Sequence, residues 1–118
     1  MGVKKENIIY PFNGIIPKEF MLAGQKYSVN FNNDPTNGKV MGLSSVVDAN
    51  IDIYKTYEGE AISPNTYENT YYHELVHQIL DNMGEKDLSG NEKFVCSFAG
   101  FLTEVMNTAI GNLIQEKK

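Results

Sequence analysis

The sequence lacks arginine and tryptophan, and it has only one cysteine and two histidines among 118 residues. All ten basic side chains are therefore lysines, and the formal net charge is −5. The lysines form no basic stripe with interleaved aromatics, so we expect no nucleic-acid partner. The single Cys96 excludes an intramolecular disulfide and favours a reducing compartment.

Long hydrophobic runs are also missing. No stretch approaches the roughly 20 apolar residues that span a bilayer, and Ile8-Ile9-Tyr10 before Pro11 is too short for the core of a signal peptide. We therefore expect a cytoplasmic protein with no membrane partner. The content of 42% hydrophobic and 21% charged residues is typical of a folded chain, and the length predicts a single domain over residues 1–118.

The first half of the chain has the residue pattern of β-strands. Ala23-Gly24-Gln25 is a plausible hairpin turn, and the polar run from Asn32 to Gly38 predicts a loop. The connections are too short for crossover helices, so the sheet should be antiparallel or mixed. About four strands are predicted, over residues 18–22, 26–31, 40–47 and 50–54.

The second half predicts two helices, which makes the fold class α+β. The first should begin near Asn65, with Glu68 completing a capping box, and should end at Gly84. The second should run from near Ser89 to about Gly111 or beyond, largely covered by the sheet and the first helix. The apolar stripe expected on the first helix consists of Tyr72, Leu75, Val76, Ile79, Leu80 and Met83.

The first predicted helix carries both histidines of the protein, in His73-Glu74-Leu75-Val76-His77. Two histidines four residues apart lie on one helix face, so both imidazoles can reach one metal ion. Glu74 projects about 100° around the helix from His73, where a general base can take a proton from a metal-bound water. The alternative is a chance pair of ordinary histidines on an amphipathic helix. We interpret the segment as a Zn²⁺ site.

A catalytic zinc ion needs a third protein ligand, and no third histidine exists. The candidate is Glu92, fifteen residues after His77, at the start of the second predicted helix. However, Ser89 and Glu92 have the spacing of a capping box, in which the glutamate would bind backbone instead of metal. Asp81 and Cys96 are weaker candidates for the ligand.

These motifs resemble the gluzincin pattern of thermolysin-like metallopeptidases, in which an Asn-Glu pair on the next helix brings the third ligand. The run from Leu88 to Val95 is similar to small zincin-like peptidases encoded by phages and prophages. The likeness covers roughly residues 66–104. It implies a minimal zincin-like domain in which His73, His77 and Glu92 bind zinc and Glu74 is the base. It also implies a peptide or protein substrate, paired with an edge strand from residues 40–54.

One position departs from that family pattern. An aspartate usually follows the glutamate ligand by four residues and braces a ligating histidine, but this chain has Cys96 there. Cys96 could brace the histidine weakly, approach the metal, or pack as a small apolar residue. Gly100, one turn further on, is expected where the two helices approach closely.

The sequence thus predicts a zinc metallopeptidase but leaves alternatives open. No arginine or third histidine can stabilise an oxyanion; Tyr54, Tyr57 and Tyr71 are candidates, although burial in the core is the simpler account of each. A zinc-stabilised binding or regulatory module with little or no activity is one alternative. A purely structural or interaction domain without metal is another, with the apolar run from Val105 to Ile114 as a partner surface.

Overall fold

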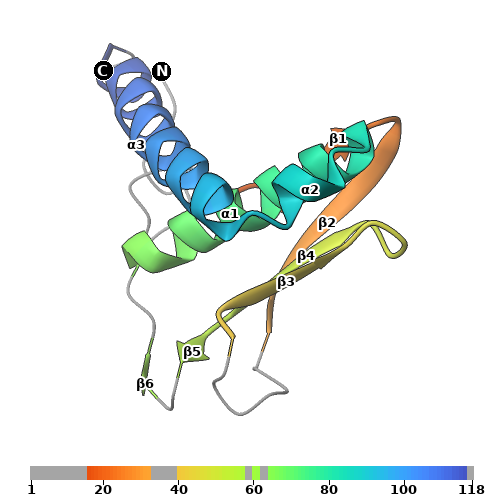
Figure 1. Cartoon of the computed structure of the whole chain (residues 1–118). Coiled ribbons are helices and arrows are strands. Elements are labelled where there is room, and N and C mark those ends of the chain that lie inside the picture. The colour runs from red at the N-terminus through yellow and green to blue at the C-terminus, as the bar shows by residue number, and fades with distance from the viewer. Residues whose placement is uncertain (1–15, 33–39, 58–59, 62–63, 117–118) are drawn as a thin grey trace.

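The computed structural model describes residues 16–32, 40–57, 60–61 and 64–116 (Figure 1). The chain is α+β, with strands in its first half and helices in its second. The elements in chain order are β1 (Glu19–Leu22), β2 (Gln25–Asn32), β3 (Gly42–Ser45), β4 (Asn50–Tyr54), β5 (Thr56–Tyr57), β6 (Glu60–Ala61), α1 (Pro64–Met83), α2 (Lys86–Ser89) and α3 (Glu92–Glu116).

The main sheet has four strands, as the sequence predicts, and their order is β1-β2-β4-β3. It is mixed, because β2 and β4 run parallel while the other two pairs are antiparallel. The chain reaches β4 from β2 without a crossover helix. It first forms β3, which leaves room for one strand beside β2, and β4 then fills this position between β2 and β3. β3 is consequently an edge strand. The two-residue strands β5 and β6, which the sequence does not predict, form a small separate ribbon.

The predicted turn between β1 and β2 is confirmed, with Ala23 and Gly24 as its two central residues. Both have positive φ angles, 52° and 77°, as a type I′ turn requires. The turn fixes the register in which Leu22 faces Gln25, and Phe20 consequently lies opposite Tyr27. The rings of Phe20 and Tyr27 stack with centroids 5.2 Å apart.

Helix α1 lies between the sheet and α3 (Figure 1), packing on β3 and β4 on one side and on α3 on the other. The predicted alternation in β4 is confirmed for Ile51 and Ile53, which are fully buried, although Tyr54 at the end of the strand is buried as well. The buried apolar cluster consists of Ile16, Val29, Ile51, Ile53, Tyr71, Tyr72, Val76, Leu80, Val95 and Ala99.

The ends of α1 are fixed by different means. The predicted start near Asn65 is confirmed to within one residue, because α1 begins at Pro64; Glu68, expected in a capping box, is buried and accepts a hydrogen bond from Asn107 on α3. Proline suits a first helical position because it has no N–H to leave unpaired. The predicted stop at Gly84 is confirmed, and its φ of 81° is the left-handed conformation of a helix C-cap. Met83, expected in the apolar stripe, is exposed.

Helix α3 differs from its prediction in three respects. It begins at Glu92, after the short α2, and not near Ser89. It packs on α1 but is not largely covered, since Phe98, Phe101 and Val105 are exposed. Among the described residues, a Cβ on Gly100 would meet no atom within 4 Å beyond its own stretch of α3, so the expected close approach of α1 and α3 there is wrong.

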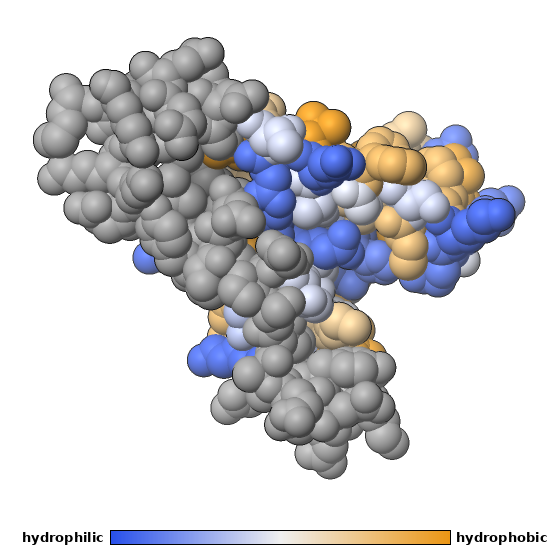
Figure 2. Space-filling model, turned by 90° about the vertical axis from the view of Figure 1, so that its left-hand side faces the viewer, coloured by the Kyte–Doolittle hydropathy of each residue, from blue (hydrophilic) through white to orange (hydrophobic). Residues whose placement is uncertain are grey.

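The described surface is mixed in character. On the side of the molecule shown in Figure 2, hydrophobic and hydrophilic side chains of the described residues are interspersed. Within the same residues, no helix combines the length and the apolar character needed to cross a membrane.

Candidate metal centre

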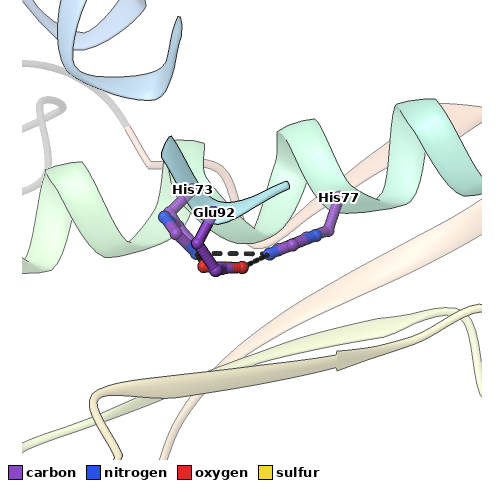
Figure 3. A group of neighbouring side chains, drawn as sticks. All are labelled: His73, His77 and Glu92. Atoms are coloured by element: carbon purple, nitrogen blue, oxygen red, sulfur yellow. Dashed lines mark hydrogen bonds and ion pairs between the residues drawn. The ribbon is translucent and has the colours of Figure 1, made fainter. Parts of the chain in front are cut away.

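The two histidines of α1 face the segment that joins α2 to α3. Their spacing of four residues places both imidazoles on one side of α1, with ring centroids 4.9 Å apart. Glu92, the first residue of α3, lies directly in front of them. Figure 3 shows the two rings and the carboxylate pointing toward one another from two different helices.

The three side chains present their donor atoms at nearly equal separations. His73 Nε2 and His77 Nε2 are 3.2 Å apart. Glu92 Oε1 lies 3.2 Å from His73 Nε2, and Glu92 Oε2 lies 3.3 Å from His77 Nε2. Tetrahedral ligands held at about 2.0–2.1 Å from one ion are about 3.3 Å apart. The group of His73, His77 and Glu92 could therefore hold a metal ion.

The start of α3 explains why Glu92 reaches this position. Asn91 is the N-cap: its Oδ1 accepts a hydrogen bond from the Phe94 N–H at 3.1 Å. The alternative capping box between Ser89 and Glu92 is thereby excluded, because Ser89 ends α2 and Glu92 is already helical. Glu92 therefore does not cap the helix. Its side chain is 62% exposed, and its carboxylate contacts the two histidines. Asp81 does not belong to the group.

The Nδ1 atoms of both rings contact side chains on the other side. His77 Nδ1 lies 3.0 Å from Oγ of the buried Ser89. His73 Nδ1 lies 3.8 Å from Cys96 Sγ. A ligating histidine usually donates its second N–H to such a partner, which fixes the tautomer and the ring orientation. Cys96 is exposed, so it does not pack as a core residue, and its contact agrees with the weak brace.

Glu74 points to a different neighbour from the histidines, as its position on the helix predicts. Its Oε1 accepts a hydrogen bond of 2.7 Å from Ser44 Oγ on β3. The close approach of β3 to α1 depends on Gly42, where a Cβ would lie 2.6 Å from Thr70 Cγ2 and 3.5 Å from Glu74 Cγ. A glycine at this position allows the strand to pass against the helix beside the carboxylate.

A cavity of about 390 Å³ opens beside His73 and Glu74. It lies between the first half of α1, the start of β3 and Cys96 of α3. Its wall combines apolar side chains from the segment just before β3 with polar groups from α1. The lining residues are Val40, Met41, Gly42, Asn69, Thr70, His73, Glu74 and Cys96.

Tyr54 and Tyr71, two of the tyrosines considered as oxyanion donors, are not among the described residues that line this cavity. Tyr54 and Tyr71 are buried at 3% and 4% exposure, and Tyr71 belongs to the apolar cluster beside Tyr72. The side chain of Tyr57 lies outside the described residues. Burial raises the pKa of Tyr71, with its neighbour Tyr72 adding to the effect. Tyr71 is thus a neutral core phenol.

The sequence did not predict the residues that contact His77 and Glu74 from neighbouring elements. Ser89 was considered only as a helix cap, and Ser44 was not considered because its place beside Glu74 follows from packing between a strand and a helix. Gln78, which donates to Ser44 Oγ at 2.7 Å, did leave a signal. It lies four residues after Glu74, so a shared helix face could have been inferred.

Comparisons of the chain with protein-family models, with curated proteins and with solved structures find no significant match.

Proposed function

We propose that this protein is a zinc-dependent hydrolase, a small zincin-like metallopeptidase of the gluzincin type. The observation that carries the proposal is the triangle of His73 Nε2, His77 Nε2 and the Glu92 carboxylate, with edges of 3.2–3.3 Å. Two imidazoles and one carboxylate are the ligand set of catalytic zinc sites that leave the fourth position open. Exposure of Glu92 leaves the group accessible from solvent.

Glu74 is the general base in this proposal. When bound, zinc would polarise both a water molecule and the carbonyl group of the substrate. Glu74 takes the proton from the water and delivers it to the leaving amine, a role that requires a carboxylate beside the ligands but not on the ion. Its place on α1 next to His73 and on the cavity wall supports this role.

The substrate is a peptide or protein segment, which approaches along β3. This strand is an edge of the sheet, so an extended peptide can add to it through backbone hydrogen bonds. The cavity beside His73 would receive one substrate side chain. Asn69 and Thr70, which line it, supply the hydrogen-bond donors that the buried tyrosines do not.

The test combines metal analysis with proteolysis. Purified protein should contain near one zinc per chain and should cleave casein or a peptide library. Glu74→Gln should retain zinc and lose at least about 100-fold in kcat, because proton transfer by a placed base contributes about 10²–10⁴-fold. Glu85→Gln, an exposed glutamate after α1, is the control and should cleave normally. Cleavage unaffected by Glu74→Gln would contradict the mechanism.

A zinc-stabilised binding or regulatory module is the second candidate. The observation that favours it is the contact between Cys96 Sγ and His73 Nδ1, 3.8 Å long, where a carboxylate would hold the ring more firmly. Zinc retention without cleavage across diverse peptides would support the module. Loss of zinc from Glu92→Gln together with continued cleavage would exclude both candidates.

A further inference from the structure

A chain of hydrogen bonds connects the buried side of α1 with Glu74. Asn82 Nδ2 donates to Tyr27 Oη at 3.1 Å, and Tyr27 donates to Gln78 Oε1 at 2.9 Å. Gln78 Nε2 donates to Ser44 Oγ at 2.7 Å, and Ser44 donates to Glu74 Oε1 at 2.7 Å. The chain crosses from α1 to β2, back to α1 and then to β3. It ends on the carboxylate that we propose as the base.

One contact fixes the direction of every bond in this chain. Asn82 Nδ2 also donates to the backbone carbonyl of Gln78 at 2.8 Å, and only an N–H can do so. The amide nitrogen of Asn82 must therefore face Tyr27, whose hydroxyl accepts from it and donates onward to Gln78 Oε1. The amide nitrogen of Gln78 is then directed at Ser44. Because Ser44 Oγ accepts there, its single proton is directed to Glu74.

Burial makes this direction expensive to reverse. Tyr27 is fully buried and Gln78 is 2% exposed, so water cannot replace a lost partner. An unsatisfied buried polar group costs more than its hydrogen bond contributes to stability. The hydroxyl of Ser44 is thus held as a donor to one oxygen of Glu74.

We propose that Ser44 is a positioning residue for Glu74. Its hydroxyl holds Oε1 and leaves Oε2 to receive the proton of the attacking water. The inference rests on the proposed function for the role of Glu74, and it adds that the orientation of the base is set from the edge strand through Gln78 and Tyr27.

Kinetics of the zinc-loaded full chain test this inference. Ser44→Ala should lower kcat about tenfold with KM unchanged within about twofold, since one hydrogen bond to a charged group is lost. Ser44→Thr keeps the hydroxyl and should recover kcat to within about threefold. Ser28→Ala, an exposed serine on β2, is the matched control and should leave kcat unchanged. A kcat within about twofold of wild type for Ser44→Ala would overturn the inference.

The direction of the chain has its own test. Gln78→Glu keeps the shape but removes the donor to Ser44, which then lies between two carboxylates and can donate to only one. The kcat of Gln78→Glu should fall as much as that of Ser44→Ala. The double variant with both substitutions should lose no more kcat than either single variant. Tyr27→Phe, which removes the donor that orients Gln78, replaces Gln78→Glu if that variant does not fold. Multiplying losses in the double variant would overturn the inference.

A folding measurement separates this inference from the proposed function. Ser44→Ala should lower the folding equilibrium constant about tenfold when Glu74 is present. In the Glu74→Ala background, the decrease caused by Ser44→Ala should be smaller by a factor of at least about three. If wild type retains zinc but cleaves nothing, the proposed function fails, and this cycle alone decides whether Ser44 holds Glu74. Equal losses in the two backgrounds would overturn the inference whether or not peptides are cleaved.

Discussion

The two imidazole rings of this protein have partners at both nitrogens. Their Nε2 atoms converge with Glu92, and their Nδ1 atoms contact Ser89 and Cys96. A ring held at both ends loses little freedom when it binds an ion, because its orientation is already set. The site is therefore built from two sets of contacts, and each set can be tested by a single substitution.

Glu92→Gln should fold normally but bind zinc much more weakly. Asn91 caps α3 whichever residue follows, so the free energy of unfolding without metal should be unchanged. The zinc affinity should fall by more than the roughly 10–100-fold typical of groups that only orient a ligand. Competition with a chromophoric chelator measures this, with the exposed Glu104→Gln on the same helix as control. Unchanged zinc affinity would show that Glu92 is not a ligand.

Ser89→Ala should weaken zinc binding without removing a ligand. The substitution deletes the acceptor for the His77 Nδ1 proton, so the ring loses its fixed tautomer and orientation. We expect a loss of roughly 10–100-fold in zinc affinity. The exposed Ser97→Ala on α3 should have no effect in the same titration. Equal affinities for Ser89→Ala and Ser97→Ala would contradict the role of Ser89.

At the scale of secondary structure, α1 carries most of the site. One side of it presents His73 and His77 to the start of α3, and another presents Glu74 to β3. Its stop at Gly84 allows the chain to turn through α2 and bring Glu92 back beside the histidines. The approach of β3 to α1 at Gly42 is equally necessary, because it brings Ser44 to Glu74.

Substitution by alanine should have opposite effects on stability at two glycines, Gly42 and Gly100. Gly42→Ala should lower the free energy of unfolding by about 1–3 kcal/mol, because the new methyl group overpacks against α1. Its Cβ would lie 2.6 Å from Thr70 Cγ2 and 3.0 Å from the Asp52 carbonyl oxygen. Gly100→Ala should raise the same free energy by about 0.5–1 kcal/mol, since α3 has open space there and alanine favours helix. Urea unfolding measures both, and destabilisation by Gly100→Ala would contradict the packing described.

At the scale of the molecule, α1 is the shared layer between the sheet and α3. It brings tyrosines as well as aliphatic residues into the core, with Tyr71 and Tyr72 in contact at 4.9 Å between ring centroids. Burial raises the pKa of Tyr72 to about 12, and the nearby Glu68 carboxylate adds to the effect. The stability of the fold thus depends on these phenols remaining protonated.

Alkaline conditions should therefore destabilise the fold. The phenols ionise near pH 10 in the unfolded chain but stay protonated in the folded one, so above pH 10 the unfolded state binds fewer protons. The tyrosine contribution should be complete below pH 10 and decline as the pH rises toward about 12. Urea unfolding between pH 8 and 12 measures this decline. Tyr72→Phe should make it shallower, and an equal slope in wild type and variant would contradict the assignment.

The sequence by itself determined the α+β class, the four main strands, the turn at Ala23-Gly24 and the stop at Gly84. These features depend on local patterns: alternation, left-handed glycine positions and helical spacing. The convergence of His73 and His77 was predictable for the same reason, because four residues make about one helical turn. Glu92 lies beside the two histidines, as predicted, and its role as a zinc ligand stays a prediction.

Tertiary structure decided what depends on contacts between distant segments. The parallel pairing of β2 with β4, the burial of Glu68 against Asn107 and the contact of Ser44 with Glu74 join residues 20 or more positions apart. A local pattern carries no information on such pairs, since it is the shape of the packed core that selects them. For the same reason, spacing along the chain does not by itself predict that Glu68 contacts Asn107 or that Glu92 contacts the two histidines instead of capping α3.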